Sequence, residues 1–412
     1  MTTPTCRHCG APLTRTLVDL GLSPLANSYV PPERGDIPCK TYPLHARVCD
    51  ACHLVQVEDA VPAQDIFNED YAYFSSFSDS WLAHCRDYVA QMIRRFGLGP
   101  EDLVIEIASN DGYLLQYFVQ AGIPVLGIEP TANTAAEAEK KGVRTRVEYF
   151  TESAARQIRA EEKAPSLVCA ANVLAHVPDI NDFVRGLAVL LSGNAVFTVE
   201  FPHLLNLIRG VQFDTIYHEH YTYLSLIAVE RIFAAAGMRV FDVQQLPTHG
   251  GSLRVFACLD GAAHPEMPGV ASVRAMEQAA RLDSPEGYAG FQDKVRRVRG
   301  DLLDFLRAAR GAGKTVAAYG AAAKGNTLLN YAGVGPELIS YCVDRSPAKQ
   351  GKLLPGSHIP IYGPEKLRQD RPDFVLILPW NLRDEIAGQL ADIAELGTQF
   401  AVPVPHLEVF SV

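Results

Sequence analysis

Residues 104–129 read VIEIASNDGYLLQYFVQAGIPVLGIE. The apolar run up to Ile107 predicts a buried strand, the small residues from Ala108 to Gly112 predict a turn, and a helix and a second strand ending at Glu129 follow. A turn of this kind brings backbone N–H groups against a ligand at the N-terminus of a helix. The stretch therefore predicts the first unit of a Rossmann-like α/β domain.

Acidic residues flank the turn and indicate the kind of ligand. Glu106 precedes it, and Glu129 stands where a carboxylate can accept hydrogen bonds from both hydroxyls of a ribose. A dinucleotide pyrophosphate usually needs three glycines, and the turn contains only Gly112. A cationic nucleoside without phosphates, such as S-adenosylmethionine (SAM), fits two acids better, and a dinucleotide or a turn without a ligand are the alternatives. The expected SAM contacts in this unit are Glu106, Ala108, Ser109, Asn110, Asp111, Gly112 and Glu129.

The composition is typical of a globular enzyme of two or three domains, with 412 residues of which 48% are hydrophobic and 20% are charged. The formal net charge of −10 argues against a nucleic-acid binder, because no basic face offsets it. The N-terminus carries no recognisable signal sequence, and no apolar run approaches the length of a membrane span. We expect a cytoplasmic protein without nucleic-acid or membrane partners, as a monomer or a homodimer.

Two C-x2-C pairs near the N-terminus predict a metal site. Cys6 and Cys9 form the first pair, and Cys49 and Cys52 form the second. Together the pairs supply four thiolates, which is the ligand set of a structural Zn²⁺ ion with no open position for catalysis. Disulfides are the competing interpretation, weakened by the lack of a secretion signal. Side chains that could replace one of the four ligands are His8, Cys39 and His53.

An aromatic and hydroxyl-rich segment, residues 71–81, precedes a predicted helix from about Ser80 to Phe96. Two interpretations remain open for this segment. It could be a hydrophobic staple with a Ser/Asp helix cap, or it could be a lid over the SAM pocket to which Tyr71 and Ser76 contribute.

Further buried strands are predicted at residues 166–172 and 195–201, with helical patterns between them. Alternating strands and helices predict a mostly parallel sheet, which binds its ligands at the carboxyl ends of the strands. Asn172, His176 and Glu200 fall on that rim, and we expect Asn172 to contribute to the SAM site.

Every residue from Tyr217 to Tyr221 is ionisable or phenolic. The histidines His218 and His220 lack the H-x3-H spacing of a helical zinc pair, so metal binding fits poorly. A general base fits better, because a neutral histidine next to Glu219 can remove a proton near neutral pH. The alternative is an exposed polar loop without a catalytic role.

The C-terminal third repeats the pattern of the first unit. A strand at residues 314–319 leads into a turn with Lys324, the next strand ends at Asp344, and Trp380 follows a third strand. This pattern predicts a second Rossmann-like domain, in which Lys324, Asp344 and Trp380 could hold the nucleotide of a substrate. The alternative is a ligand-free scaffold for dimerisation.

The chain resembles the SAM-dependent sugar C-methyltransferases that act on nucleotide-linked 4-keto deoxysugars. The family usually has glycine in place of Ala108. The motifs that carry the resemblance are the two C-x2-C pairs, YxYxSS at 71–76, EIxSNDG at 106–112, ANxLxH at 171–176, YxEH at 217–220, HGG at 249–251 and YGAxAK at 319–324.

The resemblance implies methyl transfer to a carbon next to a ketone, by way of an enolate. His220 would remove the proton, Glu219 would orient His220, and Tyr217 and His176 would steady the enolate oxygen. An O- or N-methyltransferase is the closest alternative, because a histidine base can serve other acceptors too. An NAD-dependent oxidoreductase lacks its three-glycine fingerprint, and a protein- or RNA-binding zinc module disagrees with the acidic charge.

The fold class that follows is α/β with three units. We expect a zinc module at residues 1–70, a central class I (Rossmann-like) methyltransferase domain at residues 71–262, and a C-terminal Rossmann-like domain at residues 263–412.

Overall fold

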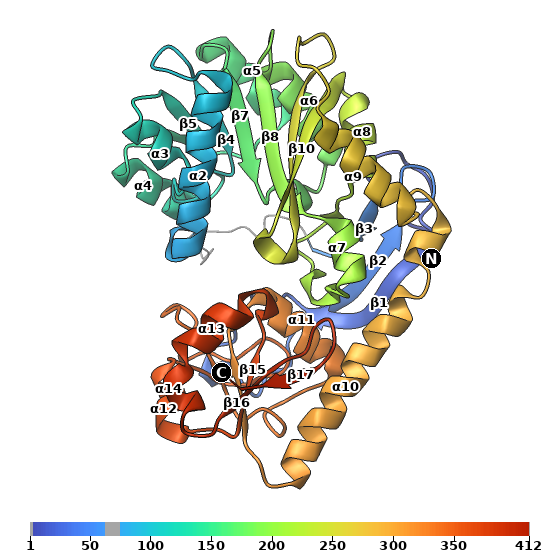
Figure 1. Cartoon of the computed structure of the whole chain (residues 1–412), viewed down its shortest axis with the longest axis vertical. Helices are drawn as coiled ribbons and strands as arrows, with labels where there is room; N and C mark the ends of the chain where they lie inside the picture. The colour runs from blue at the N-terminus through green and yellow to red at the C-terminus, as the bar shows by residue number, and fades with distance from the viewer. Residues whose placement is uncertain (1–2, 62–74, 412) are drawn as a thin grey trace.

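The computed structural model of the chain describes residues 3–61 and 75–411. Three sheets organise these residues, of four, seven and six strands. In Figure 1 the seven-stranded sheet with its helices lies at the top and the six-stranded sheet at the bottom, and the strands β1–β3 lie at the side between them. The predicted α/β architecture with a small N-terminal module and two larger units is confirmed.

The seven-stranded sheet has the order β10-β11-β8-β7-β4-β5-β6. All of its strands run parallel except β11, which is antiparallel to both of its neighbours. A dinucleotide-binding sheet of order 3-2-1-4-5-6 has no such reversed strand. The strands are β4 (Val104–Ile107), β5 (Val125–Ile128), β6 (Thr145–Arg146), β7 (Leu167–Ala171), β8 (Val196–Pro202), β10 (Met238–Leu246) and β11 (Ser252–Leu259).

Helices cover both faces of this sheet, because its strands are apolar on both sides. Val104 packs into one core and its neighbour Ile105 into the other, as the alternation of side chains along a strand requires. Helices α2 (Asp79–Phe96), α3 (Leu115–Gln120) and α4 (Ala132–Lys140) cover the first face, and α5 (Glu152–Glu161), α6 (Ile180–Leu190) and α8 (Leu226–Ala234) cover the second. The short helix α7 (Leu204–Arg209) follows β8.

Helix α2 starts one residue before the predicted position. The hydroxyl of Ser78 accepts a hydrogen bond from the N–H of Trp81 and caps the helix, and Gly97 ends it in a left-handed conformation. The cap that the sequence suggested is therefore present. Tyr71, the predicted lid residue, lies outside the described residues.

The N-terminal unit is an antiparallel sheet that borrows its last strand. Strands β1 (Arg15–Pro24), β2 (Thr41–Val48) and β3 (Val55–Val57) pair in chain order, and β9 (Thr222–Tyr223) then pairs with β3. Strand β9 directly follows the predicted base cluster. The zinc module and that cluster are thus joined through backbone hydrogen bonds.

The six-stranded sheet has the order β14-β13-β12-β15-β16-β17 and is parallel except for β17. Its elements are β12 (Val316–Tyr319), α11 (Ala323–Ala332), β13 (Cys342–Val343), β14 (Ile361–Tyr362), α12 (Glu365–Asp370), β15 (Phe374–Ile377), α13 (Arg383–Gln389), α14 (Ala391–Ala394), β16 (Gln399–Val402) and β17 (Glu408–Phe410).

Two helices connect the larger units. Helix α9 (Pro268–Ala279) lies against β10 and α8, and the long helix α10 (Phe291–Gly311) lies against α11 and β1 (Figure 1). The buried side chains of α10 recur every three or four residues, so one apolar stripe faces the core.

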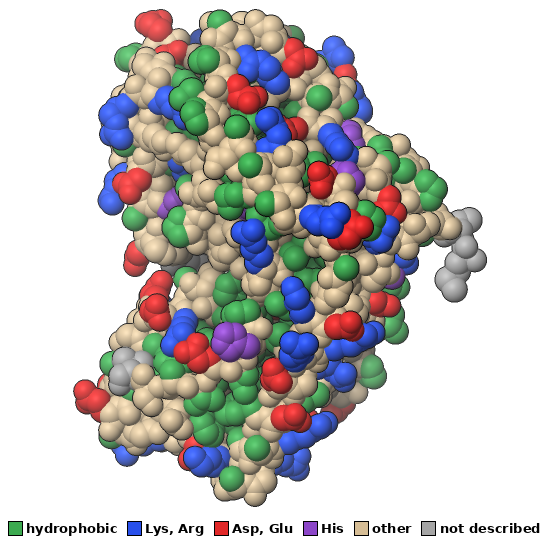
Figure 2. All heavy atoms as spheres, turned by 45° about the vertical axis from the view of Figure 1, so that its right-hand side comes forward, with side chains coloured by type: hydrophobic (Ala, Val, Ile, Leu, Met, Phe, Trp, Pro, Cys, Tyr) green, Lys and Arg blue, Asp and Glu red, His purple; other side chains and the backbone are tan. Residues whose placement is uncertain are grey.

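The charges on the outside are mixed. On the face drawn in Figure 2, basic and acidic side chains are interspersed. Among the described residues, no helix has the length and hydrophobicity that a bilayer crossing needs.

Candidate metal centre and active site

The four predicted zinc ligands converge. The sulfur atoms of Cys6, Cys9, Cys49 and Cys52 all lie within 4.8 Å of one another, with Cys6 and Cys52 at 3.5 Å and Cys9 and Cys49 also at 3.5 Å. Tetrahedral Zn²⁺ with Zn–S bonds of about 2.3 Å places its sulfurs about 3.8 Å apart, so the cluster fits one ion. These sulfurs are too far apart for a disulfide, whose S–S bond is about 2.05 Å.

The alternative ligands are engaged elsewhere. Nδ1 of His8 lies 2.8 Å from Oδ1 of Asn181, and Sγ of Cys39 lies 3.4 Å from Nε2 of His358 in the C-terminal unit. The cluster does not include His53.

The first cysteine loop also contacts the methyltransferase-like unit. Arg7, between Cys6 and Cys9, donates a hydrogen bond of 2.6 Å to the carbonyl of Pro178 and lies over the ring of Tyr221 at 5.2 Å. A metal at the cysteines would therefore hold the segments that follow His176 and His220.

The turn after β4 has a strained backbone. Ala108, Asn110 and Gly112 have φ angles of +55°, +47° and +73°. A left-handed alanine costs about 1–2 kcal/mol, because its Cβ crowds the backbone where a glycine has none. The methyl group of Ala108 is therefore accommodated at the expense of backbone strain.

Glu129 fixes this turn on the second strand. Its Oε2 accepts a hydrogen bond of 2.9 Å from the N–H of Asn110, and its Oε1 accepts one of 2.9 Å from the N–H of Thr131. The hydroxyl of Thr131 also donates to Oε1, so the two acceptor positions of that oxygen are filled, and Oε2 keeps one for a hydroxyl of a ribose. Glu129 is thus both a support for the turn and a candidate ligand contact.

The residues around the turn differ in what they offer a ligand. Oδ1 of Asp111 is buried and has no hydrogen-bond partner among the described residues, which fits a ligand amino group. Ser109 directs its hydroxyl toward Gly127, so a ligand would meet its backbone. Glu106 is fully buried, and burial raises its pKa well above the usual range. The predicted contact of Glu106 with SAM stays a prediction.

Ser76 lies at this turn, as the lid interpretation predicts. Nζ of Lys141 donates hydrogen bonds to the hydroxyl of Ser76 at 2.6 Å and to the carbonyl of Asp111 at 2.7 Å, and the N–H of Ser75 donates to Oδ1 of Asn110 at 3.0 Å. The short helix Ser75–Phe77 is thereby tied to the predicted SAM site.

His220 is held in one tautomer. Its Nδ1 lies 2.9 Å from the carbonyl of Thr215, to which it must donate, and its Nε2 lies 2.9 Å from the hydroxyl of Tyr217. Nε2 therefore carries the lone pair and accepts the hydrogen bond from Tyr217. Burial lowers the pKa of His220 well below its usual value, so the ring is neutral at neutral pH.

The predicted role of Glu219 in orienting His220 is wrong. Both carboxylate oxygens of Glu219 accept hydrogen bonds of 2.8 Å from Nδ2 of Asn27 in the N-terminal unit, and burial raises the pKa of Glu219 to about 7. The carbonyl of Thr215 orients His220 instead. His218 also points to the N-terminal unit, where its Nε2 donates to the carbonyl of Pro43 at 3.1 Å.

His176 lies beside the base, with its ring centroid 4.6 Å from that of His220. Its Nδ1 donates to the backbone carbonyl of Glu219 at 2.8 Å, and burial lowers its pKa to about 4. A neutral His176 has no second N–H, and the hydroxyl of Tyr217 donates to His220. Neither residue is therefore placed to donate to an enolate oxygen as predicted.

The C-terminal unit reaches this cluster through Lys324 and Trp380. Nζ of Lys324 donates to Oδ1 of Asn381 at 2.5 Å and lies 4.8 Å from the ring centroid of Trp380, whose Nε1 donates to Oδ2 of Asp214 at 2.7 Å. Burial raises the pKa of Asp214 to about 6, an effect that the charge of Lys324 opposes. No motif in the sequence pointed to Asp214.

Asp344 repeats the geometry of Glu129. Its Oδ2 accepts a hydrogen bond of 2.8 Å from the N–H of Ala321 in the turn after β12, and its Oδ1 accepts one of 2.8 Å from the N–H of Ser346. The predicted pseudo-repeat therefore extends to the hydrogen bonds of its acidic residue.

A buried charged group lies at the carboxyl end of β8. Glu200 accepts from Arg254 at 2.6 Å and contacts Nε2 of His84 at 2.8 Å, and its carbonyl accepts from the N–H of Asn172 at 2.8 Å. The ring of His84 stacks on Trp81 with centroids 4.9 Å apart. The sequence predicted Asn172 and Glu200 on this rim and Trp81 in the aromatic segment, whereas no motif pointed to His84 or Arg254.

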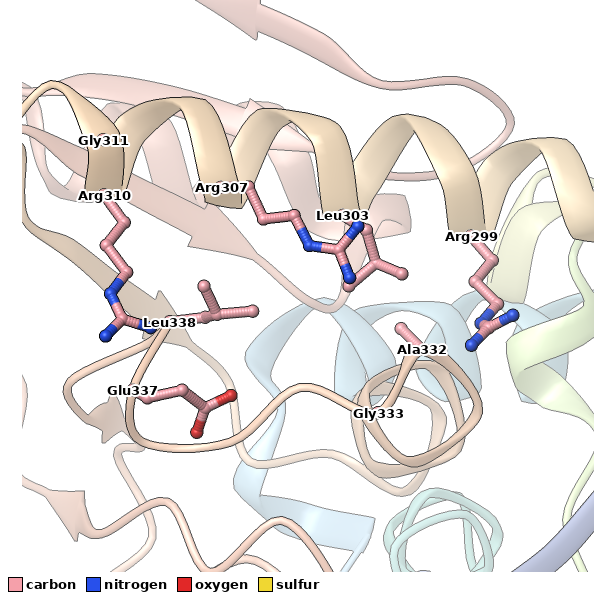
Figure 3. A pocket seen from close by; sticks show the side chains of 9 residues that line it. All are labelled: Arg299, Leu303, Arg307, Arg310, Gly311, Ala332, Gly333, Glu337 and Leu338. Carbon is pink, nitrogen blue, oxygen red and sulfur yellow. The ribbon is translucent and has the colours of Figure 1, made fainter.

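A separate hollow of about 650 Å³ lies between α10 and the loop after α11. Figure 3 shows Arg310 reaching from α10 toward the loop that carries Glu337, and Arg299 reaching toward the end of α11 at Ala332. None of the candidate site residues lines this hollow.

Comparisons with known proteins cover the chain. Family models match residues 6–67 ("Putative zinc binding domain"), 81–243 ("Methyltransferase domain") and 247–405 ("C-methyltransferase C-terminal domain"). C-methyltransferase NovU of Streptomyces niveus is 37% identical over 406 residues, which are 98% of this chain and 96% of NovU.

The following two solved structures each cover less than half of this chain. Magnesium protoporphyrin IX methyltransferase from Synechocystis PCC 6803 is 17% identical, covering 49% of this chain and 99% of its own, with a TM-score of 0.36. The PH0226 protein from Pyrococcus horikoshii OT3 is 12% identical, covering 46% of this chain and 95% of its own, with a TM-score of 0.38.

Zinc should be part of the fold. Metal analysis of the purified chain should give one Zn²⁺ per chain, and Cys49→Ser should release it and lower the melting temperature by more than about 5 °C, because a structural site contributes directly to folding. Cys39→Ser, which changes a thiol outside the cluster, should retain the metal. A parent protein without zinc, or a Cys49→Ser variant of unchanged stability, would contradict this.

Glu129→Gln should weaken SAM binding by about 10- to 100-fold, because a charged acceptor is lost where each such hydrogen bond contributes about 1.5–3 kcal/mol. Calorimetric titration with SAM measures the change. The control is Glu137→Gln on α4, where Glu137 pairs with the exposed Lys140. Equal SAM affinity in Glu129→Gln and the parent would remove Glu129 from the ligand contacts.

Proposed function

The chain belongs to the family of SAM-dependent C-methyltransferases with an N-terminal zinc-binding domain and a C-terminal domain of their own, and from this membership we propose that its methyl acceptor is a nucleotide-linked 4-keto deoxysugar. The family sets aside the oxygen- and nitrogen-acceptor alternatives.

The neutral base at His220 is the observation that carries the proposal. A carbon acceptor has no lone pair, and a neighbouring ketone supplies one when a base removes the proton between them. Nε2 of His220 carries a lone pair and already accepts a hydrogen bond from Tyr217. We assign His220 as the proton acceptor and Tyr217 as the hydroxyl that passes the proton on. SAM, when bound, supplies a methyl group on a positively charged sulfur.

The surroundings of His220 favour this role. The ring is half-buried, lies against His176, and has a neutral neighbour there because burial lowers the pKa of His176 as well. A neutral histidine pair accepts a proton without a competing carboxylate in contact. The negative charge that develops on the substrate would stabilise the protonated ring, since opposite charges attract strongly in a buried site.

The C-terminal unit is the proposed holder of the nucleotide diphosphate. Gly320 has a φ of +90°, and the turn that it opens leads into α11, whose N-terminus has free N–H groups suited to a phosphate. Lys324 adds a cation, and Asp344 and Trp380 stand at the neighbouring strand ends. Binding energy from the nucleotide would then fix the sugar against the base.

Incubation with SAM and a panel of 4-keto nucleotide sugars, read by mass spectrometry, tests the substrate class. A gain of one methyl group on at least one member is the expected result, and it should be located on carbon next to the ketone. A panel in which no member is methylated by active, SAM-binding enzyme would overturn the proposal.

His220→Asn should lower the rate of solvent deuterium exchange at the acceptor carbon by about 10²–10⁴-fold, and leave SAM affinity unchanged. The matched control is His218→Gln, because His218 is the neighbouring histidine but faces Pro43. In the parent, exchange should stay level down to below pH 6.5, because burial lowers the pKa of His220 and its proton-accepting form persists there. Normal exchange in His220→Asn would place the base elsewhere.

Lys324→Met should weaken binding of the sugar nucleotide by about tenfold or more and leave SAM binding normal, because it removes a partly buried cation while keeping a side chain of similar length. Lys366→Met is the control, since Lys366 pairs with Asp370 in the same unit. Should Lys324→Met bind both ligands normally, the C-terminal unit is better interpreted as a scaffold.

A further inference from the structure

The turn between β10 and β11 holds a histidine in a strained and tightly confined position. His249 has a φ of +56°, which is uncommon for a residue with a side chain. A Cβ on Gly250 would lie 2.6 Å from Cη2 of Trp380, and one on Gly251 would collide with Asn206. The two glycines therefore let the turn press against both partners, and the position of His249 is fixed. Backbone strain held in this way is often found at functional sites.

The ring of His249 lies at the meeting point of the units. Its centroid is 5.4 Å from that of Trp81, which itself lies 6.0 Å from Tyr113 beside the SAM turn. On the other side the turn touches Trp380, on which Lys324 rests. His249 thus stands between the SAM turn and the C-terminal unit, where an acceptor must lie if it is to meet a methyl group.

The surroundings also determine which nitrogen of His249 carries the proton. Nδ1 is buried and has no hydrogen-bond partner among the described residues, whereas Nε2 is not enclosed in this way. A proton on Nδ1 would be a donor without an acceptor in the interior, so the neutral ring carries it on Nε2. Burial lowers the pKa of His249 to about 4, and nearby Lys324 adds to this effect, so the ring is neutral at neutral pH.

His249 and His220 are therefore opposite tautomers. His220 carries its proton on Nδ1 and presents a lone pair at Nε2, whereas His249 presents an N–H at Nε2. The other candidate donors are already engaged, since Tyr217 donates to His220 and His176 donates to the carbonyl of Glu219. A neutral imidazole is a known hydrogen-bond donor to a carbonyl that becomes an enolate.

We propose that His249 is a further catalytic residue, whose Nε2–H donates a hydrogen bond to the ketone oxygen of the acceptor and to the enolate that forms from it. This inference rests on the proposed ketone substrate. In the step, the proton on the acceptor carbon passes through the hydroxyl of Tyr217 to Nε2 of His220. The electron pair of the C–H bond becomes the C=C bond of the enolate, and the carbonyl π pair moves to the oxygen that His249 holds.

The test measures deuterium exchange at the acceptor carbon without SAM, using a 4-keto nucleotide sugar that the parent methylates. His249→Gly relieves the backbone strain and removes the donor, and we expect the exchange rate to fall about 10²-fold while SAM affinity stays normal. Added imidazole should restore part of the exchange in this variant, which a purely structural role would not allow. His249→Asn, which tolerates the left-handed backbone, is the second variant and should also lose exchange.

The chain offers a matched control in His358, which has the same φ of +56° but contacts Gly35 and Cys39. His358→Asn should exchange at the parent rate. If both His249 variants exchange deuterium at the rate of the parent, the proposed role of His249 is overturned. The proposed substrate class would not be affected by that result. If the parent neither catalyses deuterium exchange nor methylates any ketone in the panel, the proposed function fails and the role of His249 fails with it.

Discussion

Hydrogen bonds from the two flanking units hold residues 213–221, a segment whose only regular structure is one short helical turn. Nδ2 of Asn27 donates to the carboxylate of Glu219 from the N-terminal side, and the hydroxyl of Thr327 donates to the carbonyl of Ile216 from α11. The geometry of the base therefore depends on all three units at once. This dependence gives the zinc module and the C-terminal domain a physical role in methyl transfer beyond any ligand that they hold.

The two larger units stabilise the turn after their first strand in the same way. Each has a tight turn after its first strand, and each places an acid at the end of the second strand to accept an N–H from that turn. Glu129 and Asp344 satisfy backbone N–H groups of turns that lie outside the strands and helices and so have no partner in regular structure. A carboxylate at this position is thus needed by the fold itself, which is why its presence alone does not reveal a bound nucleotide.

The sequence predicted what depends on local pattern. Apolar runs located the strands, and the spacing of the cysteines identified a cluster that the structure assembles. Roles that depend on the direction in which a side chain points were not predictable from the sequence. Glu219 precedes His220, but neighbours in an irregular segment point different ways, so adjacency in the chain did not mean contact. The place of His249 depends on Trp81 and Trp380, which lie far away in the sequence.

The pairing of β9 with β3 has a consequence for how the chain folds as it is made. Strands β1 to β3 emerge from the ribosome first, and β3 then has an unpaired edge until residues 222 and 223 have been synthesised. An open edge can pair with the wrong chain. The four cysteines all precede residue 222, so early metal binding would hold the three strands together until β9 has been synthesised. Strand β9 would then be added when most of the central domain has been translated.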